Sequence, residues 1–253
     1  MESSIIDIKS IINSKNQSSK NWNNHNFLFE KIALILEKKL LELNNKFKNI
    51  LLLSNDAGEA LEIILNANPE KVIFCSPFRN LLYKSNSKQN VQKIESNFDR
   101  IPCKNLTFDL IISNLCLHNI NNRKTHFKDL HELLNEDGLI ICNFFGGDTL
   151  KELKHSLYLT DEKIFNGIYM RIPQNPQMIE VSNLFAEIGF KELVSEKINY
   201  QIYYHNVRKI LDDLKGTGEN CSLKNRMKGM ITNNYINTLN EFYKKKISGS
   251  RRA

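Results

Sequence analysis

The stretch FDLIIS at residues 108–113 points to the fold class of this chain. It is short, mostly apolar and closed by a small polar residue, which is typical of a buried strand in a parallel sheet. The stretches NILLLS at 49–54, KVIFC at 71–75 and GLIICNFF at 138–145 have the same character. These four runs predict a mostly parallel sheet.

Apolar residues between these runs recur at three- and four-residue steps, which predicts helices. Strands that alternate with helices predict an α/β, Rossmann-like sheet with helices on both faces and ligands at the carboxyl ends of the strands. Residues 191–204 are expected to be extended, and Gly189 is expected to stop the helix before them. The expected helices are 27–43, 58–66, 122–134, 148–157, 176–188, 206–214 and 222–245.

The 253 residues suffice for one sizeable core. Residues 1–25 are polar and are expected to form a loosely ordered arm. Residues 26–245 are expected to form a single domain, and residues 246–253 a basic tail. The sequence does not determine the oligomeric state.

The formal net charge is +7, but lysine, asparagine and isoleucine are abundant throughout the chain. Such uniform enrichment is typical of a compositional bias and does not favour a nucleic-acid partner. The five cysteines are scattered and lack a CxxC pair, so neither a structural metal site nor a disulfide framework is expected. With no secretory signal pattern and no apolar run of ~18 residues, the chain is expected to be cytoplasmic without a membrane span.

Two segments resemble a known family. The first is FDLIISNLCLH at 108–118, followed by NEDGLIICNF at 135–144. The second is FGGDTLKEL at 145–153, together with DLKGTGEN at 213–220 and Arg226. From Phe27 to Tyr243 the chain resembles class I S-adenosylmethionine (SAM)-dependent methyltransferases, in particular the methyltransferase-like family associated with respiratory complex I assembly. A more distant resemblance is to the biotin-pathway enzyme that methylates a malonyl carrier.

The resemblance implies a seven-stranded sheet, SAM as cofactor, and modification or chaperoning of a complex I subunit as partner. Family members end in a strand that completes the antiparallel edge of the sheet. No β-patterned segment is found near the end of this sequence, so the final edge strand is expected to be missing. An unpaired edge needs a helix, a tail or a partner to cover it.

The SAM loop of the family follows the first strand and has the pattern acid-x-Gly-x-Gly-x-Gly, because the backbone must approach the cofactor closely. Of these positions only Gly58 is retained. Leu52 stands in place of the acid, and Ser54 and Asp56 stand in place of two glycines. Asp56 can either cap the next helix or contact the cofactor.

At the end of the second strand, Ser76 stands where the family has an acid that holds both ribose hydroxyls. One hydroxyl cannot replace a bidentate pair, and each lost contact costs about 1–3 kcal/mol. Asp99 is either a contact to the adenine amino group or a solvated loop carboxylate. These substitutions predict SAM binding weakened by several orders of magnitude.

Asn114 and His118 lie at the end of the fourth predicted strand, where the family lines the methyl-transfer pocket. His118 is either a proton acceptor, because its ordinary pKa lies near neutrality, or a packed residue that hydrogen-bonds the backbone. Asn119 stands where the family has tryptophan.

Gly146 and Gly147 are expected to form a tight turn, with Asp148 capping the next helix. A contact to substrate is the alternative role for these three residues. Arg226 and the turn at 215–219 are expected to shape the mouth of the crevice.

Two functions follow. The first is a SAM-dependent methyltransferase that acts on a protein partner in complex I assembly, without a metal. The second is a non-catalytic assembly protein, a pseudoenzyme on the same fold. Titration with SAM distinguishes them.

Overall fold

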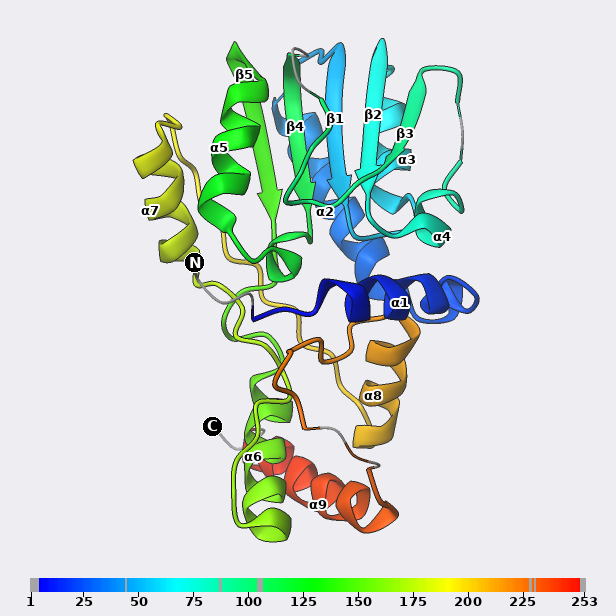
Figure 1. The fold of residues 1–253 in the computed structure, drawn as a ribbon, viewed down its shortest axis with the longest axis vertical. Helices are drawn as coiled ribbons and strands as arrows, with labels where there is room; N and C mark the ends of the chain where they lie inside the picture. The colour runs from blue at the N-terminus through cyan, green and yellow to red at the C-terminus, as the bar shows by residue number, and fades with distance from the viewer. Residues whose placement is uncertain are drawn as a thin grey trace.

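The structure is a computed structural model that describes residues 5–43, 45–86, 88–103, 107–227, 229 and 231–250. Its centre is a parallel sheet of order β3-β2-β1-β4-β5 (Figure 1), which confirms the predicted fold class. The last residues of the predicted basic tail, 251–253, lie outside the described residues. The strands are β1 (Asn49–Ser54), β2 (Lys71–Ser76), β3 (Val91–Glu95), β4 (Phe108–Asn114) and β5 (Leu134–Asn143).

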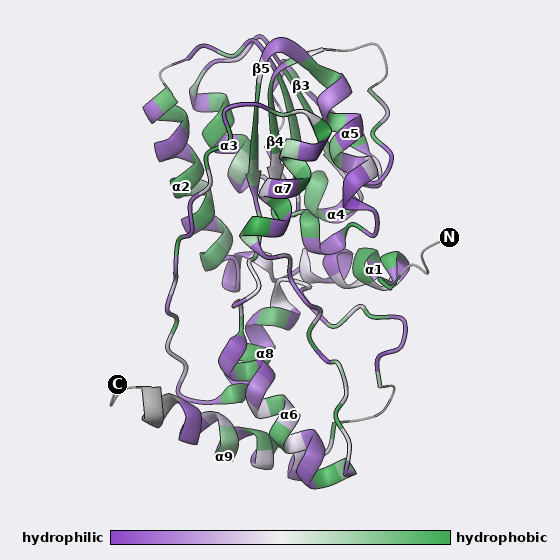
Figure 2. Cartoon of the chain, turned by 90° about the vertical axis from the view of Figure 1, so that its left-hand side faces the viewer, coloured by the Kyte–Doolittle hydropathy of each residue, from purple (hydrophilic) through white to green (hydrophobic). Residues whose placement is uncertain are grey.

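Alternate residues of the central strands pack into two separate cores. In β1, Leu51 and Leu53 join the core that includes helices α5 (Arg123–Leu133) and α7 (Met178–Ile188). Ile50 and Leu52 join the core on the other face, with α2 (Phe27–Leu43) and α3 (Glu59–Asn66). The central strands are hydrophobic along most of their length (Figure 2) because both faces are covered. Burying each such side chain contributes about 2 kcal/mol.

The N-terminal segment differs from the expected loose arm. Its residues form helix α1 (Ile8–Ser18) and a 3₁₀ turn, η1 (Trp22–Asn24). Helix α1 crosses the carboxyl ends of the strands (Figure 1), next to the short helix α4 (Arg79–Leu82). Ile11 and Trp22 are buried in the sheet core. The helix was not predicted, because two of the side chains that it buries, Lys15 and Ser18, are polar and leave no helical pattern of apolar residues.

A helical layer lies below the sheet in Figure 1. It contains α6 (Lys151–Phe165), α8 (Val207–Gly216) and α9 (Asn233–Ser250), which share a third hydrophobic core. The buried carboxylate of Asp161 is satisfied there by the Arg171 guanidinium at 2.8 Å and the Tyr235 hydroxyl at 2.7 Å.

The described sheet ends at β5, so it has five strands where the family resemblance implied seven. Residues 191–204 were expected to be extended, and they form no strand and are mostly exposed. The α7 helix before them stops at Gly189 as predicted, with the left-handed φ of 112°. β5 is therefore the edge of the sheet, and its residues Leu139 to Asn143 are only half-buried.

Candidate functional site

The carboxyl ends of β1 and β4 bring together three of the predicted cofactor residues. Asn114 Nδ2 donates hydrogen bonds to Ser54 Oγ at 3.1 Å and to Asp56 Oδ2 at 2.9 Å. Ser54 and Asp56 are fully buried, and Asn114 is 2% exposed. The sequence predicted this juxtaposition because adjacent parallel strands end at the same edge of a sheet.

Asp56 holds the start of α3. Its carboxylate accepts backbone hydrogen bonds from Gly58 at 2.9 Å and from Ala60 at 3.3 Å. Burial, together with the nearby Glu59, raises the pKa of Asp56 to about 6. Both carboxylate oxygens are engaged by the protein itself, so the geometry gives Asp56 the helix-start role among the two that the sequence left open.

The retained Gly58 is explained by packing. Its φ is 117°, and a Cβ at this position would lie 2.4 Å from the Ser85 Cβ. Only glycine adopts this conformation without strain. The backbone conformation before α3 and the contact with Ser85 therefore suffice to explain why this residue is glycine, without a ligand.

The two other predicted cofactor residues lie apart from this cluster. Ser76 is fully buried at the end of β2, where its hydroxyl accepts a hydrogen bond from the Phe78 amide at 3.4 Å. Asp99 is exposed on a loop, beside a small cavity of about 40 Å³. Neither lines the large groove described below.

A buried ion pair lies where the carboxyl ends of β1 and β4 meet. Glu219 accepts from Lys15 Nζ at 2.6 Å, from Asn55 Nδ2 at 3.0 Å, and contacts His118 Nε2 at 3.0 Å. Burial alone would raise the pKa of Glu219, but Lys15 and His118 outweigh it, so the pKa is well below its ordinary value. Burial lowers the pKa of Lys15, and Glu219 opposes that effect.

The sequence analysis missed the roles of Lys15 and Asn55. Lys15 lies in a segment that looked like a polar arm, and no local pattern marks it. Glu219 belongs to the DLKGTGEN segment that carried the family resemblance, so a signal for it was present.

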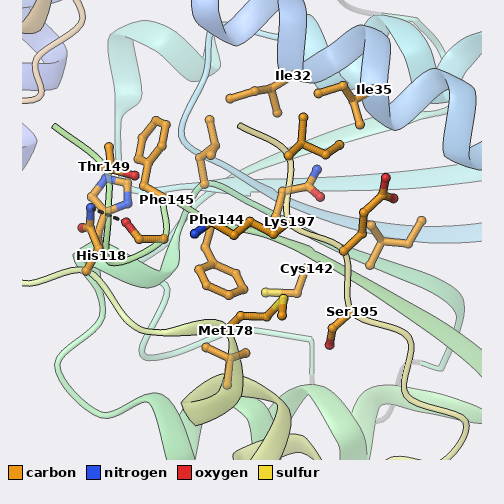
Figure 3. Close-up of a pocket in the computed structure, with 18 of the residues that line it drawn as sticks. Ile32, Ile35, His118, Cys142, Phe144, Phe145, Thr149, Met178, Ser195 and Lys197 are labelled. Carbon is orange, nitrogen blue, oxygen red and sulfur yellow. Dashed lines mark hydrogen bonds between the residues drawn. The ribbon is translucent and has the colours of Figure 1, made fainter. Parts of the chain in front are cut away.

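His118 connects this buried cluster to an open groove. Its ring lies 5.3 Å from that of Phe145, and Nδ1 is buried without a hydrogen-bond partner in the described structure. The groove has a volume of about 1960 Å³ and runs between β5, α2 and residues 191–202. Figure 3 shows His118 and Phe145 at one end of the groove, with Phe144, Cys142 and Met178 along it.

The predicted turn at residues 146–148 lines the groove, but Asp148 does not cap a helix. Helix α6 begins after Leu150, and no side chain caps it. The Asp148 carboxylate instead pairs with Lys197 Nζ at 2.6 Å across the groove. The predicted helix cap is therefore wrong, because the chain makes an additional turn after Asp148 before the helix starts.

Arg226 does not line the groove. Its guanidinium donates to the Leu223 carbonyl at 2.8 Å and to Asp7 Oδ2 at 3.3 Å. It therefore fastens the N-terminal segment to the loop after α8. The prediction that Arg226 shapes the mouth of the crevice is therefore wrong, because its guanidinium binds Asp7 and Leu223 instead.

These residues do not fit an adenosyl group in the arrangement observed. The polar side chains at the ends of β1 and β4 are buried and hydrogen-bonded to one another, and Ser76 at the end of β2 is buried. Lys15 and Glu219 fill the space above β1 and β4. No cluster of three or more metal-binding side chains occurs among the described residues. Within the same residues, every helix is too short or too polar to cross a bilayer.

Comparison with known proteins agrees with this fold. Residues 57–142 match a family described as "Methyltransferase domain". The chain is 34% identical over 123 residues to a Mus musculus protein named "Arginine-hydroxylase NDUFAF5, mitochondrial". This alignment covers 48% of this chain and 36% of that protein. It is 29% identical over 243 residues to malonyl-[acyl-carrier protein] O-methyltransferase 2 of Ilyobacter polytropus, covering 91% of this chain and 90% of the relative.

Among solved structures, the plantazolicin methyltransferase BpumL in complex with SAH overlaps with a TM-score of 0.49 at 15% identity, covering 72% of this chain and 76% of that one. The sheet order and the matches in sequence confirm the predicted resemblance to class I methyltransferases, and the family match covers residues 57–142. The chain spans about a third of the length of the Mus musculus relative.

Proposed function

We propose that this chain is a SAM-dependent methyltransferase-like protein that acts on a protein partner in the assembly of respiratory complex I. The observation that carries the proposal is the match of residues 57–142 to a methyltransferase domain on a Rossmann-like sheet. The name of the relative malonyl-[acyl-carrier protein] O-methyltransferase gives a group carried by a protein as its acceptor.

The groove beside β5 supports a macromolecular partner. It is lined by apolar side chains such as Phe144 and Ile140, and its rim carries the charged side chains of Lys197 and Asp148. Small-molecule sites are usually enclosed and have volumes of ~300–1,000 Å³. A groove of about 1960 Å³ is larger than a small acceptor needs.

His118 is the candidate catalytic residue at the inner end of the groove. Nδ1 has no partner among the described residues, and Glu219 holds the ring through Nε2. We assign Gly146, Gly147 and Asp148 to partner contacts, and Ser54, Asp56, Gly58, Ser76, Asp99 and Asn114 to the cofactor side. A cytoplasmic location remains a prediction from the sequence.

A second candidate is the non-catalytic assembly protein. It is favoured by the burial of Ser54 and Asp56 and by the mutual bonding of the residues around them. It would bind the partner through the same groove and would not turn over SAM.

Calorimetric titration with SAM and S-adenosylhomocysteine separates the two candidates. Micromolar binding supports the methyltransferase, and His118→Ala should then reduce turnover more than stability. Absence of heat and of a thermal shift supports the assembly protein.

The role in assembly is tested independently of SAM. Depletion of the chain from the cells that make it should lower the amount of fully assembled complex I on a native gel. Unchanged complex I would contradict both candidates.

A further inference from the structure

Lys15 is the most unusual side chain of the crevice. It is fully buried, although it comes from a surface-crossing helix of mostly polar residues. Its ammonium lies 5.1 Å from the ring centroid of Phe29, 5.5 Å from that of Trp22 and 5.9 Å from that of Phe78. With Glu219 Oε1 at 2.6 Å, these three rings form what we call the aromatic cage.

The aromatic cage has the chemistry of a site for an organic cation. Aromatic faces within about 6 Å attract a positive charge, and rings arranged around one point select alkylated cations over strongly hydrated ones. A carboxylate adds a full opposite charge. In this chain the cation is intramolecular.

The cage lies at the place where this type of sheet binds ligands. β1 is flanked by β2 on one side and β4 on the other, so the strand order reverses there and a crevice opens at the carboxyl ends. Asn55 follows β1 and His118 follows β4, and both bind Glu219. The electrostatic influence of Asp56 also reaches Lys15.

Two segments far apart in the sequence keep Lys15 in this place. Gly218 lies against the Lys15 backbone so closely that a Cβ would be 2.9 Å from the Lys15 Cα. The Asp7 amide donates to the Ser222 carbonyl at 2.7 Å, and Ile6 forms an antiparallel bridge with Leu223. We call residues 5–18 and 216–226 together the plug.

The other side of α1 lies against α4. Asn16 binds Asn80 through two hydrogen bonds of 2.9 and 3.1 Å, and both are exposed. The plug therefore combines the Lys15–Glu219 ion pair and the buried Ile11 side chain with peripheral polar contacts that water can replace.

We propose that the aromatic cage is an organic-cation site of the cofactor crevice, occupied by Lys15 in the closed form, and that a sulfonium ligand enters only when the plug is displaced. This rests on the proposed function for the identity of the sulfonium, SAM. The lysine ammonium and the sulfonium carry the same charge, so they compete for one position.

Chemical rescue tests the cage itself. Lys15→Ala deletes the side chain and leaves the three rings, so n-propylammonium should raise its melting temperature in a saturable way. The neutral analogue 1-propanol should raise it far less. Wild type, Lys15→Met (which keeps the cage filled) and Lys9→Ala, an exposed lysine of the same helix, should not respond.

An equal response of wild type and Lys15→Ala to n-propylammonium would overturn the cation site. If Lys15→Ala does not fold because Glu219 is left unpaired, Lys15→Ala with Glu219→Gln removes that charge, and the same comparison with 1-propanol applies.

Titration of the same variants tests the competition with SAM. Lys15→Ala should bind SAM at least tenfold more tightly than wild type and Lys15→Met do, and more tightly than it binds S-adenosylhomocysteine, which lacks the positive sulfur. Equal affinities of wild type and Lys15→Ala for SAM would overturn the plug. Loss of complex I after depletion would still support the proposed function, so the two failures are distinguishable.

Discussion

The crevice above β1 and β4 and the groove beside β5 are neighbours joined by His118, but they differ in what fills them. In the crevice, polar side chains face one another and are buried, and Lys15 with Glu219 completes the packing. In the groove, apolar side chains such as Phe144 and Ile140 are only half-buried. The chain therefore satisfies the polar groups of the crevice internally and leaves the groove open.

The largest difference in unfolding free energy between the two regions is expected when a buried aromatic side chain is replaced by alanine. Trp22 is fully buried, packs 4.8 Å from the Phe29 ring and donates to Glu59 Oε1 at 2.6 Å. Trp22→Ala should lower the free energy of unfolding by about 3–5 kcal/mol, the usual cost of such a cavity. Phe144→Ala in the groove should cost about 1 kcal/mol. Denaturant unfolding measures both, and equal losses would contradict the distinction between a filled and an open region.

Stability should also respond to acid through His126, which is buried in helix α5. Its Nδ1 donates to the Phe98 carbonyl at 2.7 Å, and burial lowers its pKa from 6.5 to about 4. Between pH 6.5 and 4 the unfolded chain binds more protons at this residue than the folded chain does, so stability falls as the pH falls. The loss attributable to His126 should be about 3 kcal/mol.

His126→Gln is the control for this pH dependence. Asp56, with its raised pKa of about 6, acts in the opposite direction between pH 4 and 6 and is present in both proteins. The wild-type value minus the variant value therefore isolates His126. A difference in unfolding free energy that does not change from pH 7 to pH 4 would refute the assignment.

Glycine substitutions should destabilise the crevice more than the groove. Gly218 has a φ of 70° and abuts Lys15, whereas a methyl group added at Gly146 in the groove would have no atom within 4 Å. Gly218→Ala should destabilise the protein by about 2 kcal/mol because it adds strain and a close contact. Gly146→Ala should change thermal unfolding little, and a large loss there would show that the groove is tightly packed around this turn.

The smallest effect is expected at the rim of the groove. Asp148 and Lys197 are 62% and 54% exposed, and exposed pairs contribute about 0–1 kcal/mol. Asp148→Asn should change the unfolding free energy by less than about 0.5 kcal/mol, and added salt should remove the change. A loss above about 2 kcal/mol, well outside the range of exposed pairs, would mean that this pair holds residues 191–204 in place.

The sheet could be predicted from the local pattern of apolar residues. The apolar runs at 49–54, 71–75 and 108–113 are parallel strands, because strands covered on both faces are mostly apolar. The run at 138–145 lies mostly in β5, which begins earlier, at Leu134, and ends at Asn143. The sequence also predicted the juxtaposition of Ser54, Asp56 and Asn114, since neighbouring parallel strands end together. β3 was not predicted, because its polar and half-buried residues lack that signal.

The residues that fill the crevice could not be predicted from the sequence, because they come together only in the folded chain. Lys15 and Glu219 are 204 residues apart, and neither has a local pattern that predicts a buried partner. A lysine in a polar segment is normally solvated, and its burial depends on a carboxylate and three rings that folding brings from distant parts of the chain. Secondary structure follows from nearest neighbours in the sequence, whereas the state of the site follows from contacts that exist only after the chain has folded.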